Sequence, residues 1–359
     1  MVRAFYAYGA ILLSVMVLNL PVNTLDPTQV THNNADDYFP KISGHYIIYY
    51  GEIEGNKEII LHDWEKDVSF QLTNNAFDDV NPFIDGNYIA WEGWESETES
   101  DIYFYDMDNQ EMMRLGQKGM IEFSPKIGGN KITWLSQCEG KSYIFLFDIP
   151  TKITTRIKLH TTNIEDISLN NNFLVWRDFD GTDSDIFLYD MERKIVQRIT
   201  NNDYEDDNPV INGYNVAWSG KSNGKNNIFI YDIRSGLTRQ LTDNNVDDIK
   251  PNINNNYLVW ESFDQHKQVH IYDILKGTTS LISNPHYNNV NPQLAGHYLV
   301  WTGISPKEPR LFVHNLKQNT TASFAMFDYN NVKPYIDGDK IVWHDRSGDD
   351  SEIFLYTLK

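Results

Sequence analysis

Short apolar runs separated by polar turns recur along almost the whole chain. In residues 201–242 an acidic loop leads to Pro209, a turn at Asn212-Gly213 follows, and an apolar run ends at Trp218. A second apolar run and a short alternating run complete the unit. Gly and Asn accept the positive φ that tight hairpin turns require. The pattern therefore predicts four short strands in each unit and no helix.

Three columns of residues recur in register at spacings of about 42 residues. The first column contains Pro40, Pro82, Pro125, Pro209, Pro251, Pro292 and Pro334, with Ile167 in the fourth unit. The second column, nine residues later, contains Tyr49, Trp91, Trp134, Trp176, Trp218, Trp260, Trp301 and Trp343. The third column contains Asp63, Asp106, Asp148, Asp190, Asp232, Asp273, Asn315 and Thr357. A fixed period of this length is typical of a repeat architecture.

The two longer runs of each unit are apolar without alternation, which indicates strands that are covered on both faces. A sheet between two neighbouring sheets meets this requirement, and that is the environment of a propeller blade. The last run of each unit alternates, as in 238–241, and suits an exposed outer edge. The Pro suits the innermost edge, where its missing N–H removes no ladder hydrogen bond.

The two ends of the chain complement each other. The last unit stops after its third strand, whereas the N-terminal run Thr28-Gln29-Val30-Thr31 resembles the fourth strand at 239–242. The sequence therefore predicts an all-β fold, a single eight-bladed β-propeller of four-stranded antiparallel blades. The N-terminal strand completes the last blade and closes the ring.

Composition limits the partners. The net charge of −20 and the isoelectric point near 4.8 disfavour binding to nucleic acid or to an anionic membrane. The single cysteine, Cys138, excludes an intrachain disulfide. Residues 1–24 combine Arg3 with an uncharged apolar run, which is typical of a signal peptide or an N-terminal membrane anchor. We therefore expect residues 25–359 to form the propeller outside the cytoplasm, secreted or at the cell surface.

Residues 28–359 resemble the TolB-type, or WD-like, β-propeller repeat family. The resemblance rests on the Asp-x-x-Pro loops at 79–82 and 206–209, on the strand-ending Trp and on runs such as 185–190. The chain departs from the family at Ile167, Asn315 and Thr357, and it has eight units where TolB has six. The resemblance implies a rigid binding platform and no particular reaction.

One candidate binding site is an acid that stands three residues before the Pro in five units. These acids are Asp37, Asp79, Glu122, Asp206 and Asp248. On the first interpretation they form an arc at the channel mouth that binds a cation or a basic partner. On the second, each acid stabilises its own loop by accepting backbone N–H bonds. Trp94, which has no counterpart in the other units, is a further candidate for partner contact.

A candidate metal site surrounds Gly181. Its ligands would be Asp178, Asp180, Asp183 and Asp185. Alternate acids with a central Gly are typical of a Ca²⁺ loop, but the EF-hand pattern lacks its Glu at the twelfth position. The alternative is a solvated Asp-Gly turn between two strands. Ca²⁺ is the one cofactor that the sequence brings into consideration.

No catalytic motif, hydrolase domain or phosphate-binding glycine loop occurs in the sequence, so we assign no catalytic residue. We predict a monomeric, non-enzymatic binding or scaffold protein that recognises a protein or glycan partner at the cell envelope through its acidic loops. The alternative is a propeller-type polysaccharide lyase or glycosidase. That enzyme would need clustered His or Arg, or paired carboxylates, at the channel.

Overall fold

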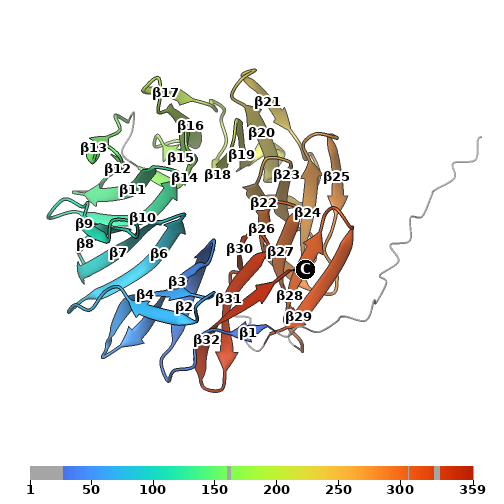
Figure 1. The fold of residues 1–359 in the computed structure, drawn as a ribbon. Helices are drawn as coiled ribbons and strands as arrows, with labels where there is room; N and C mark the ends of the chain where they lie inside the picture. The colour runs from blue at the N-terminus through green and yellow to red at the C-terminus, as the bar shows by residue number, and fades with distance from the viewer. Residues whose placement is uncertain (1–26, 160–162, 306, 327–331, 359) are drawn as a thin grey trace, which may run out of the picture.

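The molecule is a closed ring of eight four-stranded antiparallel blades (Figure 1). The computed structural model describes residues 27–159, 163–305, 307–326 and 332–358. One parallel bridge, between Ile121 and Ser100, joins the sheets of the second and third blades into one continuous sheet. The predicted eight-bladed propeller is confirmed.

Each blade contributes one strand to each of four layers around the axis, and blades 1 to 8 are numbered by their innermost strands. The innermost strands are β2 (Asp37–Ser43), β6 (Asp78–Asp85), β10 (Ile121–Gly128), β14 (Ile164–Leu169), β18 (Asp206–Asn212), β22 (Asp247–Ile253), β26 (Asn288–Ala295) and β30 (Tyr335–Asp337). The second strands are β3 (Tyr46–Ile53), β7 (Tyr88–Ser96), β11 (Lys131–Cys138), β15 (Phe173–Phe179), β19 (Asn215–Gly220), β23 (Tyr257–Phe263), β27 (Tyr298–Ile304) and β31 (Lys340–Ser347). The third strands are β4 (Asn56–Asp63), β8 (Glu99–Asp106), β12 (Lys141–Asp148), β16 (Ser184–Asp190), β20 (Asn227–Asp232), β24 (Lys267–Asp273), β28 (Arg310–Asn315) and β32 (Asp350–Thr357). The outermost strands are β5 (Val68–Gln71), β9 (Glu111–Arg114), β13 (Ile153–Arg156), β17 (Ile195–Arg198), β21 (Leu237–Gln240), β25 (Thr278–Leu281), β29 (Thr320–Ala325) and β1 (Thr28–Gln29).

A bulge interrupts the innermost strands just before the Pro column. In blade 2 the pairing of β6 with β7 shifts between Val80 and Phe83, and Asn81 has a φ of 51°. The residue before the Pro column has a positive φ in seven blades, at Phe39, Asn81, Ser124, Asp166, Asn208, Lys250 and Asn291. Because the bulge already leaves the ladder locally unpaired, Pro fits there without removing a sheet hydrogen bond.

The core lies between neighbouring blades and is centred on the Trp column. All seven Trp side chains of this column are at most 2% exposed. Each packs against a ring of the third strand. In blade 5 the ring centroids of Trp218 and Phe229 are 5.6 Å apart, and in blade 7 those of Trp301 and Phe312 are 5.2 Å apart. Burial on both faces explains why these strands are apolar without alternation.

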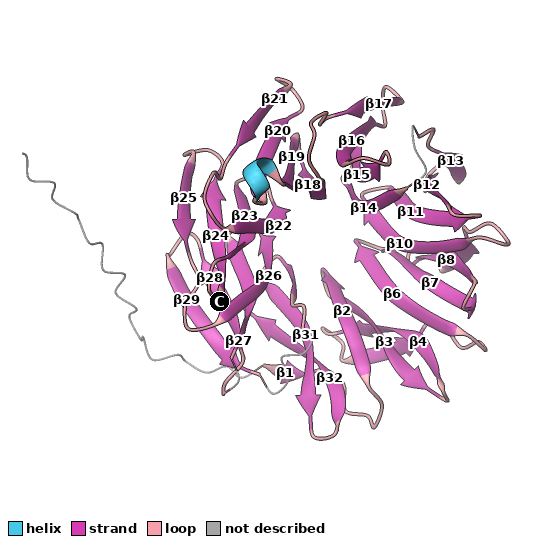
Figure 2. Ribbon diagram, turned by 180° about the vertical axis from the view of Figure 1, so that it is seen from behind, coloured by secondary structure: helices cyan, strands magenta, loops and turns pink. Residues whose placement is uncertain are grey.

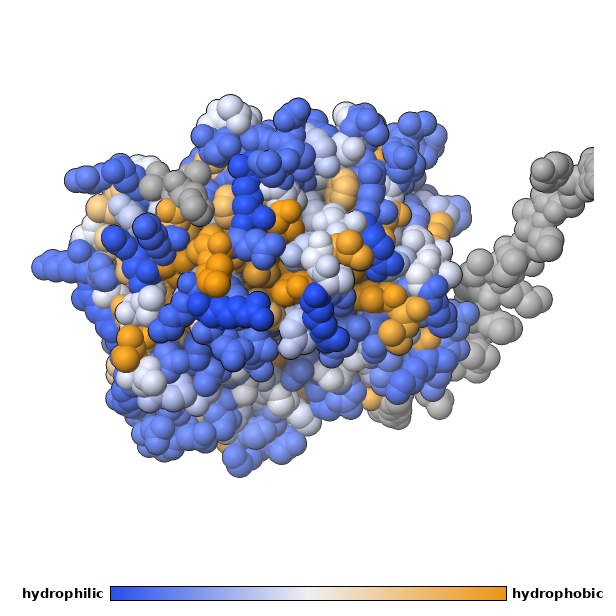
Figure 3. Space-filling view, turned by 90° about the horizontal axis from the view of Figure 1, so that it is seen from above, coloured by the Kyte–Doolittle hydropathy of each residue, from blue (hydrophilic) through white to orange (hydrophobic). Residues whose placement is uncertain are grey.

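The outermost strands form an exposed edge, as the alternating pattern predicts. Ile153, Ile195 and Leu237, the first residues of β13, β17 and β21, are 60, 56 and 66% exposed. The view onto this side of the ring shows apolar side chains scattered among hydrophilic ones (Figure 3). The outer rim is therefore of mixed polarity.

The N-terminal strand closes the ring by completing blade 8. β1 lies beside β32, so that the blue and red ends of the chain meet (Figure 1), and Gln29 pairs with Phe354. The hydroxyl oxygen of Thr31 accepts a hydrogen bond from the backbone N–H of Ile353 at 2.9 Å. Thr73 of blade 1 accepts the equivalent bond at 2.8 Å. The predicted closure is confirmed.

The one helical element of the described residues is η1 (Ser222–Gly224), a single turn between β19 and β20 (Figure 2). Nothing helical in this part of the chain has the length and apolarity of a membrane span. The predicted leader, 1–24, lies outside the described residues, so export stays a prediction.

Candidate functional site

Two sets of loops share one face of the ring. They are the loops between second and third strands and the loops that enter each innermost strand. The backbone N–H of Lys57, in β4, donates to the Asp78 carboxylate of the next blade at 3.0 Å, which brings the two sets together. We call this side of the ring the loop face. Its loops between second and third strands are 54–55, 97–98, 139–140, 180–183, 221–226, 264–266 and 348–349. Its loops that enter the innermost strands are 30–36, 72–77, 115–120, 199–205, 241–246 and 282–287.

The five acids before the Pro column are buried and do not form an exposed arc. Their side chains are between 0 and 2% exposed: Asp37, Asp79, Glu122, Asp206 and Asp248. This placement corrects the expectation that they line the channel mouth. The acids at the start of the innermost strands instead face the Trp of the paired strand, as in Asp79–Trp91, Asp206–Trp218 and Asp248–Trp260.

These acids hold the loops to the Trp column. In blade 5 the Asp206 carboxylate accepts hydrogen bonds from the indole N–H of Trp218 at 2.9 Å and from the amide of Asn202 at 2.8 Å. The indole bond recurs in Asp79–Trp91, Asp248–Trp260 and Asn289–Trp301. Because Asn289 makes the same bond without a charge, the geometry supports the loop-stabilising interpretation.

Burial also changes the ionisation of these groups. It raises the pKa of Asp37, Asp79 and Asp206 to about 6, and that of Glu122 to about 7. Hydrogen bonds from neighbouring side chains oppose the shift without cancelling it. Burial therefore favours the uncharged form of these carboxyl groups in the folded protein.

Asp178 belongs to the same buried layer and not to a loop. It lies in β15, two residues after Trp176, at a position where blade 5 has Gly220. A Cβ built on Gly220 would lie 2.4 Å from a carboxylate oxygen of Asp206, so a side chain at this position points into the place of the buried acid. Blade 4 has Ile164 in the column of those acids. The second strand of blade 4 therefore supplies the carboxyl group that the first strand lacks.

The other three predicted metal ligands lie together. Carboxylate oxygens of Asp180, Asp183 and Asp185 are all within 4.8 Å of one another. Asp180 accepts hydrogen bonds from the backbone N–H and the hydroxyl of Thr182 at 2.9 and 2.6 Å. Asp185 is buried and forms an ion pair with Arg198. The oxygens could meet on a divalent cation, but all three carboxylates already have protein partners, since Asp183 also accepts a hydrogen bond from the Thr182 hydroxyl at 3.0 Å.

We expect the turn interpretation to hold for this cluster. Asp180→Asn should lower the melting temperature slightly, because it weakens the turn at 180–183, and millimolar Ca²⁺ in place of EDTA should not change it. Differential scanning fluorimetry of the wild type, Asp180→Asn and Asp206→Asn would measure this. A rise that only Ca²⁺ produces, and that only Asp180→Asn abolishes, would instead establish a metal site.

Trp94 lies at the end of β7 and is half-buried. Its indole N–H donates to the Glu92 carboxylate at 3.0 Å, and the other oxygen of Glu92 accepts the backbone N–H of Ser124 in blade 3 at 2.8 Å. The indole thus extends a contact between blades 2 and 3 and keeps part of its surface free for a partner.

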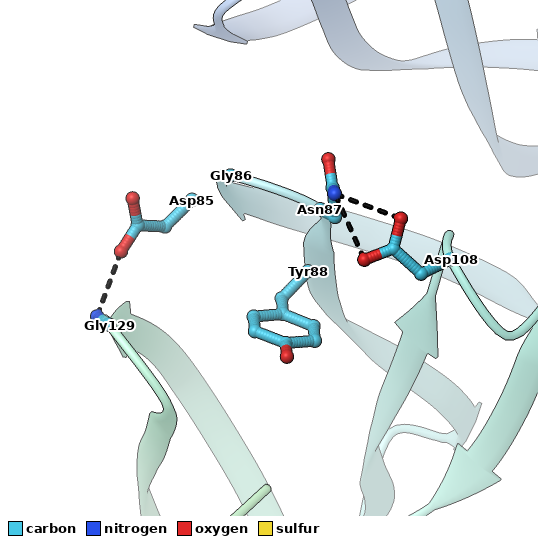
Figure 4. Close-up of a pocket in the computed structure, with 6 residues that line it drawn as sticks. All are labelled: Asp85, Gly86, Asn87, Tyr88, Asp108 and Gly129. Carbon is cyan, nitrogen blue, oxygen red and sulfur yellow. Dashed lines mark hydrogen bonds between the residues drawn. The ribbon is translucent and has the colours of Figure 1, made fainter.

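The opposite face carries the turns between first and second strands and a small cavity of about 210 Å³ between blades 2 and 3 (Figure 4). The Asp85 carboxylate accepts the backbone N–H of Gly129 at 2.9 Å, and the amide of Asn87 donates to Asp108 at 3.0 Å. Asp337 accepts the equivalent bond from the backbone N–H of Gly44, and the amide of Asn170 donates to the carbonyl of Gly213. Asp85, Asp337 and Asn170 therefore join neighbouring blades, whereas the bond between Asn87 and Asp108 lies within blade 2.

Sequence reasoning missed one column, the residues that follow the Pro on the innermost strands. They are Lys41, Phe83, Lys126, Ser168, Val210, Asn252, Gln293 and Tyr335. Two lysines and no acid stand there in a chain with 50 acidic and 30 basic residues. This departure from the overall composition was visible in the sequence once the Pro column had been aligned.

No protein-family model and no curated protein sequence matches the chain. Solved structures do. Dipeptidyl peptidase 4 from Porphyromonas gingivalis matches with a TM-score of 0.62 at 13% identity, over 86% of this chain and 57% of that one. The propeller domain of the Trilobed protease from Pyrococcus furiosus matches with a TM-score of 0.58 at 15% identity, over 83 and 99%. An oligogalacturonate lyase in complex with manganese matches with a TM-score of 0.58 at 12% identity, over 93% of each chain.

These similarities define the class of the protein, which is a β-propeller. The chain spans about 60% of the length of the puromycin hydrolase that it matches and 55% of that of a prolyl endopeptidase. TolB from Acinetobacter baumannii also matches, at 14% identity over 80% of this chain and 78% of that one, with a TM-score of 0.44. At these identities the similarity concerns the fold, and membership of the TolB-type family stays a prediction.

Proposed function

We propose that this propeller is a non-enzymatic binding or scaffold protein outside the cytoplasm, which recognises a protein or glycan partner through the loop face. The observation that carries the proposal is the division of the acids there into two sets. One set is buried in the blades and holds the loops, as Asp206 does. The other set is exposed and varies from blade to blade. A rigid frame that presents variable loops is the usual arrangement of a binding surface.

The exposed set makes the loop face acidic. Its members are Glu54, Glu97, Glu139, Asp180, Asp203, Glu205, Asp243, Asp264 and Asp349. In the same loops the exposed lysines are Lys118 and Lys221. Such a surface speeds association with a cationic partner and repels nucleic acid and polyuronates. The partner that fits best is a protein with a basic surface, or a neutral glycan.

The location of the protein rests on the leader. The apolar segment within 1–24 supports export, and the propeller would then act as a monomer in the cell envelope or medium. Fractionation of cells that carry a C-terminal tag tests this location.

The alternative is a polysaccharide lyase or glycosidase. It is supported by the similarity in fold to the oligogalacturonate lyase, which is matched over 93% of each chain. A glycosidase needs two carboxyl groups about 5 to 9.5 Å apart at the reacting bond. The residues that follow the Pro column on the innermost strands include no Asp or Glu. Assays of reducing ends and of unsaturated products on polysaccharides would detect such an enzyme.

Capture from cell-envelope extracts tests the binding proposal. The bait is the full chain, compared with the triple variant Glu54→Gln, Glu97→Gln, Asp264→Asn. A matched control, Glu65→Gln, Asp67→Asn, Glu192→Gln, removes the same charge from the opposite face. We expect the purified partner to bind the loop-face variant at least about tenfold more weakly, and the control unchanged. Equal binding of both variants, or turnover of a polysaccharide, would overturn the proposal.

A further inference from the structure

Aromatic and cationic side chains alternate on the innermost strands of four neighbouring blades. From blade 8 through blade 3, the residues after the Pro column are Tyr335, Lys41, Phe83 and Lys126. Lys41, Phe83 and Lys126 are each the first paired residue after the bulge of their strand. They therefore lie at one level around the axis, on the strands at the centre of the ring (Figure 2).

Each lysine lies over the aromatic ring of the preceding blade. The ammonium nitrogen of Lys41 is 4.4 Å from the ring centroid of Tyr335, and that of Lys126 is 5.3 Å from the ring centroid of Phe83. These are cation–π distances, so the rings hold the amines in place without neutralising their charge.

Glu92 and Asp166 act on Lys126 through their charge, but among the described residues neither forms an ion pair with it. Among the described residues neither Lys41 nor Lys126 takes part in an ion pair, and both are half-buried. Burial, together with the positive charges of Lys126 and Lys333, lowers the pKa of Lys41 to about 7. For Lys126, burial is the largest effect and lowers the pKa; the charge of Glu92 raises it, that of Lys333 lowers it and that of Asp166 raises it.

An unneutralised amine in a partly buried site is unfavourable, because the charge has lost water without gaining a partner. Two such amines close enough to repel each other add to this cost. A bound anion would offset both the lost hydration of the amines and the repulsion between them. The remaining blades place Ser168, Val210, Asn252 and Gln293 at the same level, so this column contains no acid, and the acids that act on Lys126 are Glu92 and Asp166 of other positions.

We propose that Lys41, Lys126 and Lys333 form an oxyanion-binding site at the axis of the propeller, for a small ligand that carries carboxylate or phosphate groups. Tyr335 and Phe83 form its apolar walls. Lys333, which is exposed and precedes Pro334, stands at the end of the column nearer the loop face, so the ligand enters from that side. The site uses the innermost strands and is independent of the loop-face function proposed above.

The chemistry of the site is electrostatic. Ammonium groups donate charge-assisted hydrogen bonds of about 2.7 to 2.9 Å to carboxylate or phosphate oxygens. The aromatic walls exclude water and thereby strengthen this attraction. The ligand must be compact, because the side chains of eight neighbouring strands surround the axis.

Isothermal titration calorimetry on the full chain tests the proposal. Inorganic phosphate and citrate are the two probes, each at about pH 6 so that Lys41 is protonated, with the ionic strength matched by sodium chloride. The variants are Lys41→Gln, Lys126→Gln and the double substitution. Blade 7 already carries Gln293 at this position, so the fold accommodates Gln. The control is the double variant Lys66→Gln, Lys276→Gln, which removes two exposed lysines of the opposite face.

We expect each single variant to weaken binding at least about tenfold, the double variant to abolish it, and the control to bind as the wild type does. Lys41→Arg with Lys126→Arg should retain binding, which separates lost charge from misfolding. Binding of phosphate alone or of citrate alone identifies the ligand group. No binding of either probe to the wild type, or unchanged binding in the double Gln variant, would overturn the site.

Discussion

A chain that starts at Asn33 should melt well below a chain that starts at Leu25. The shorter chain lacks the closing strand, and we expect it to lose more than about 3 kcal/mol of unfolding free energy. Thermal and urea unfolding of the two chains measure the difference.

The expected loss has three sources. The ladder between β1 and β32 disappears, together with the bond from the Val30 N–H to the Ile353 carbonyl at 2.7 Å. Val30 no longer packs on the cluster of buried residues that includes Ile42 and Leu355. The backbone N–H of Ile353 also loses the hydroxyl of Thr31. Each hydrogen bond contributes about 1 kcal/mol and the apolar contact a similar amount.

Two controls separate ring closure from a general effect of truncation. Thr31→Val and Thr73→Val remove equivalent bonds in blades 8 and 1, so both should lower the melting temperature, and Thr31→Val more so because its hydroxyl also donates to Glu352. A synthetic peptide of residues 27–33, added to the short chain, should pair with the free edge of β32 and restore stability. Equal melting temperatures for the short and long chains would contradict the closure.

The repeat could be predicted from the sequence because its signals are local. A Pro, a turn and a Trp nine residues later specify two strands and the hairpin between them, and eight copies specify the ring. The closing strand could be predicted because Thr28 to Thr31 match a strand type that had seven other examples. In these cases the evidence lies within a few residues, or within the comparison of one unit with another.

The environment of the acids could not be predicted in the same way. Asp206 and Trp218 are 12 residues apart, and only the antiparallel pairing of β18 with β19 brings the carboxylate to the indole. A pattern of charged residues in a loop does not reveal whether a side chain points outward. Asp178 is an example. In the sequence it stands close to Asp180 and Asp183, but its side chain is buried in a strand.

The axial lysines were missed for a different reason. Lys41 and Lys126 are 85 residues apart and are joined only by the symmetry of the ring. Each is unremarkable in its own unit. Aligning the eight units and comparing every position, including those that vary between units, would have brought the two lysines together. In a symmetrical fold, such variable positions are where a single binding site can form.

Stability should fall as the pH rises from about 5 to about 8. Folding raises the pKa of Asp37, Asp79 and Asp206 to about 6 and that of Glu122 to about 7. A raised carboxyl pKa means that the folded state favours the protonated form. Its stabilising contribution is therefore complete below the unfolded pKa of about 4 and is lost as the pH rises through 6 to 7. Shifts of about two units correspond to roughly 2 to 3 kcal/mol for each group.

At low pH the stability should fall again, because other carboxyl groups lose their stabilising contribution. A hydrogen bond from Lys131 lowers the pKa of Asp148 to about 2, so its contribution is present above pH 4 and is lost as the pH falls through 2. The bell-shaped profile should have its maximum at about pH 4 to 5. Urea unfolding across this range measures the profile. An unfolding free energy that stays constant or rises between pH 5 and pH 8 would contradict it.

Glu122→Gln should reduce the change in unfolding free energy between pH 5 and pH 8. The Glu122 carboxylate accepts the backbone N–H of Gln117 at 3.2 Å, and the amide oxygen of Gln can accept the same bond. The substitution also ends the repulsion from Asp101, which contributes to the raised pKa of Glu122. We therefore expect the variant to be more stable than the wild type by about 1 to 3 kcal/mol at pH 8 and similar at pH 5. Glu54→Gln, at an exposed position of the loop face, changes the net charge equally and should leave the slope unchanged. A loss of stability of the same size at both pH values would assign Glu122 an obligatory ionised role in the loop.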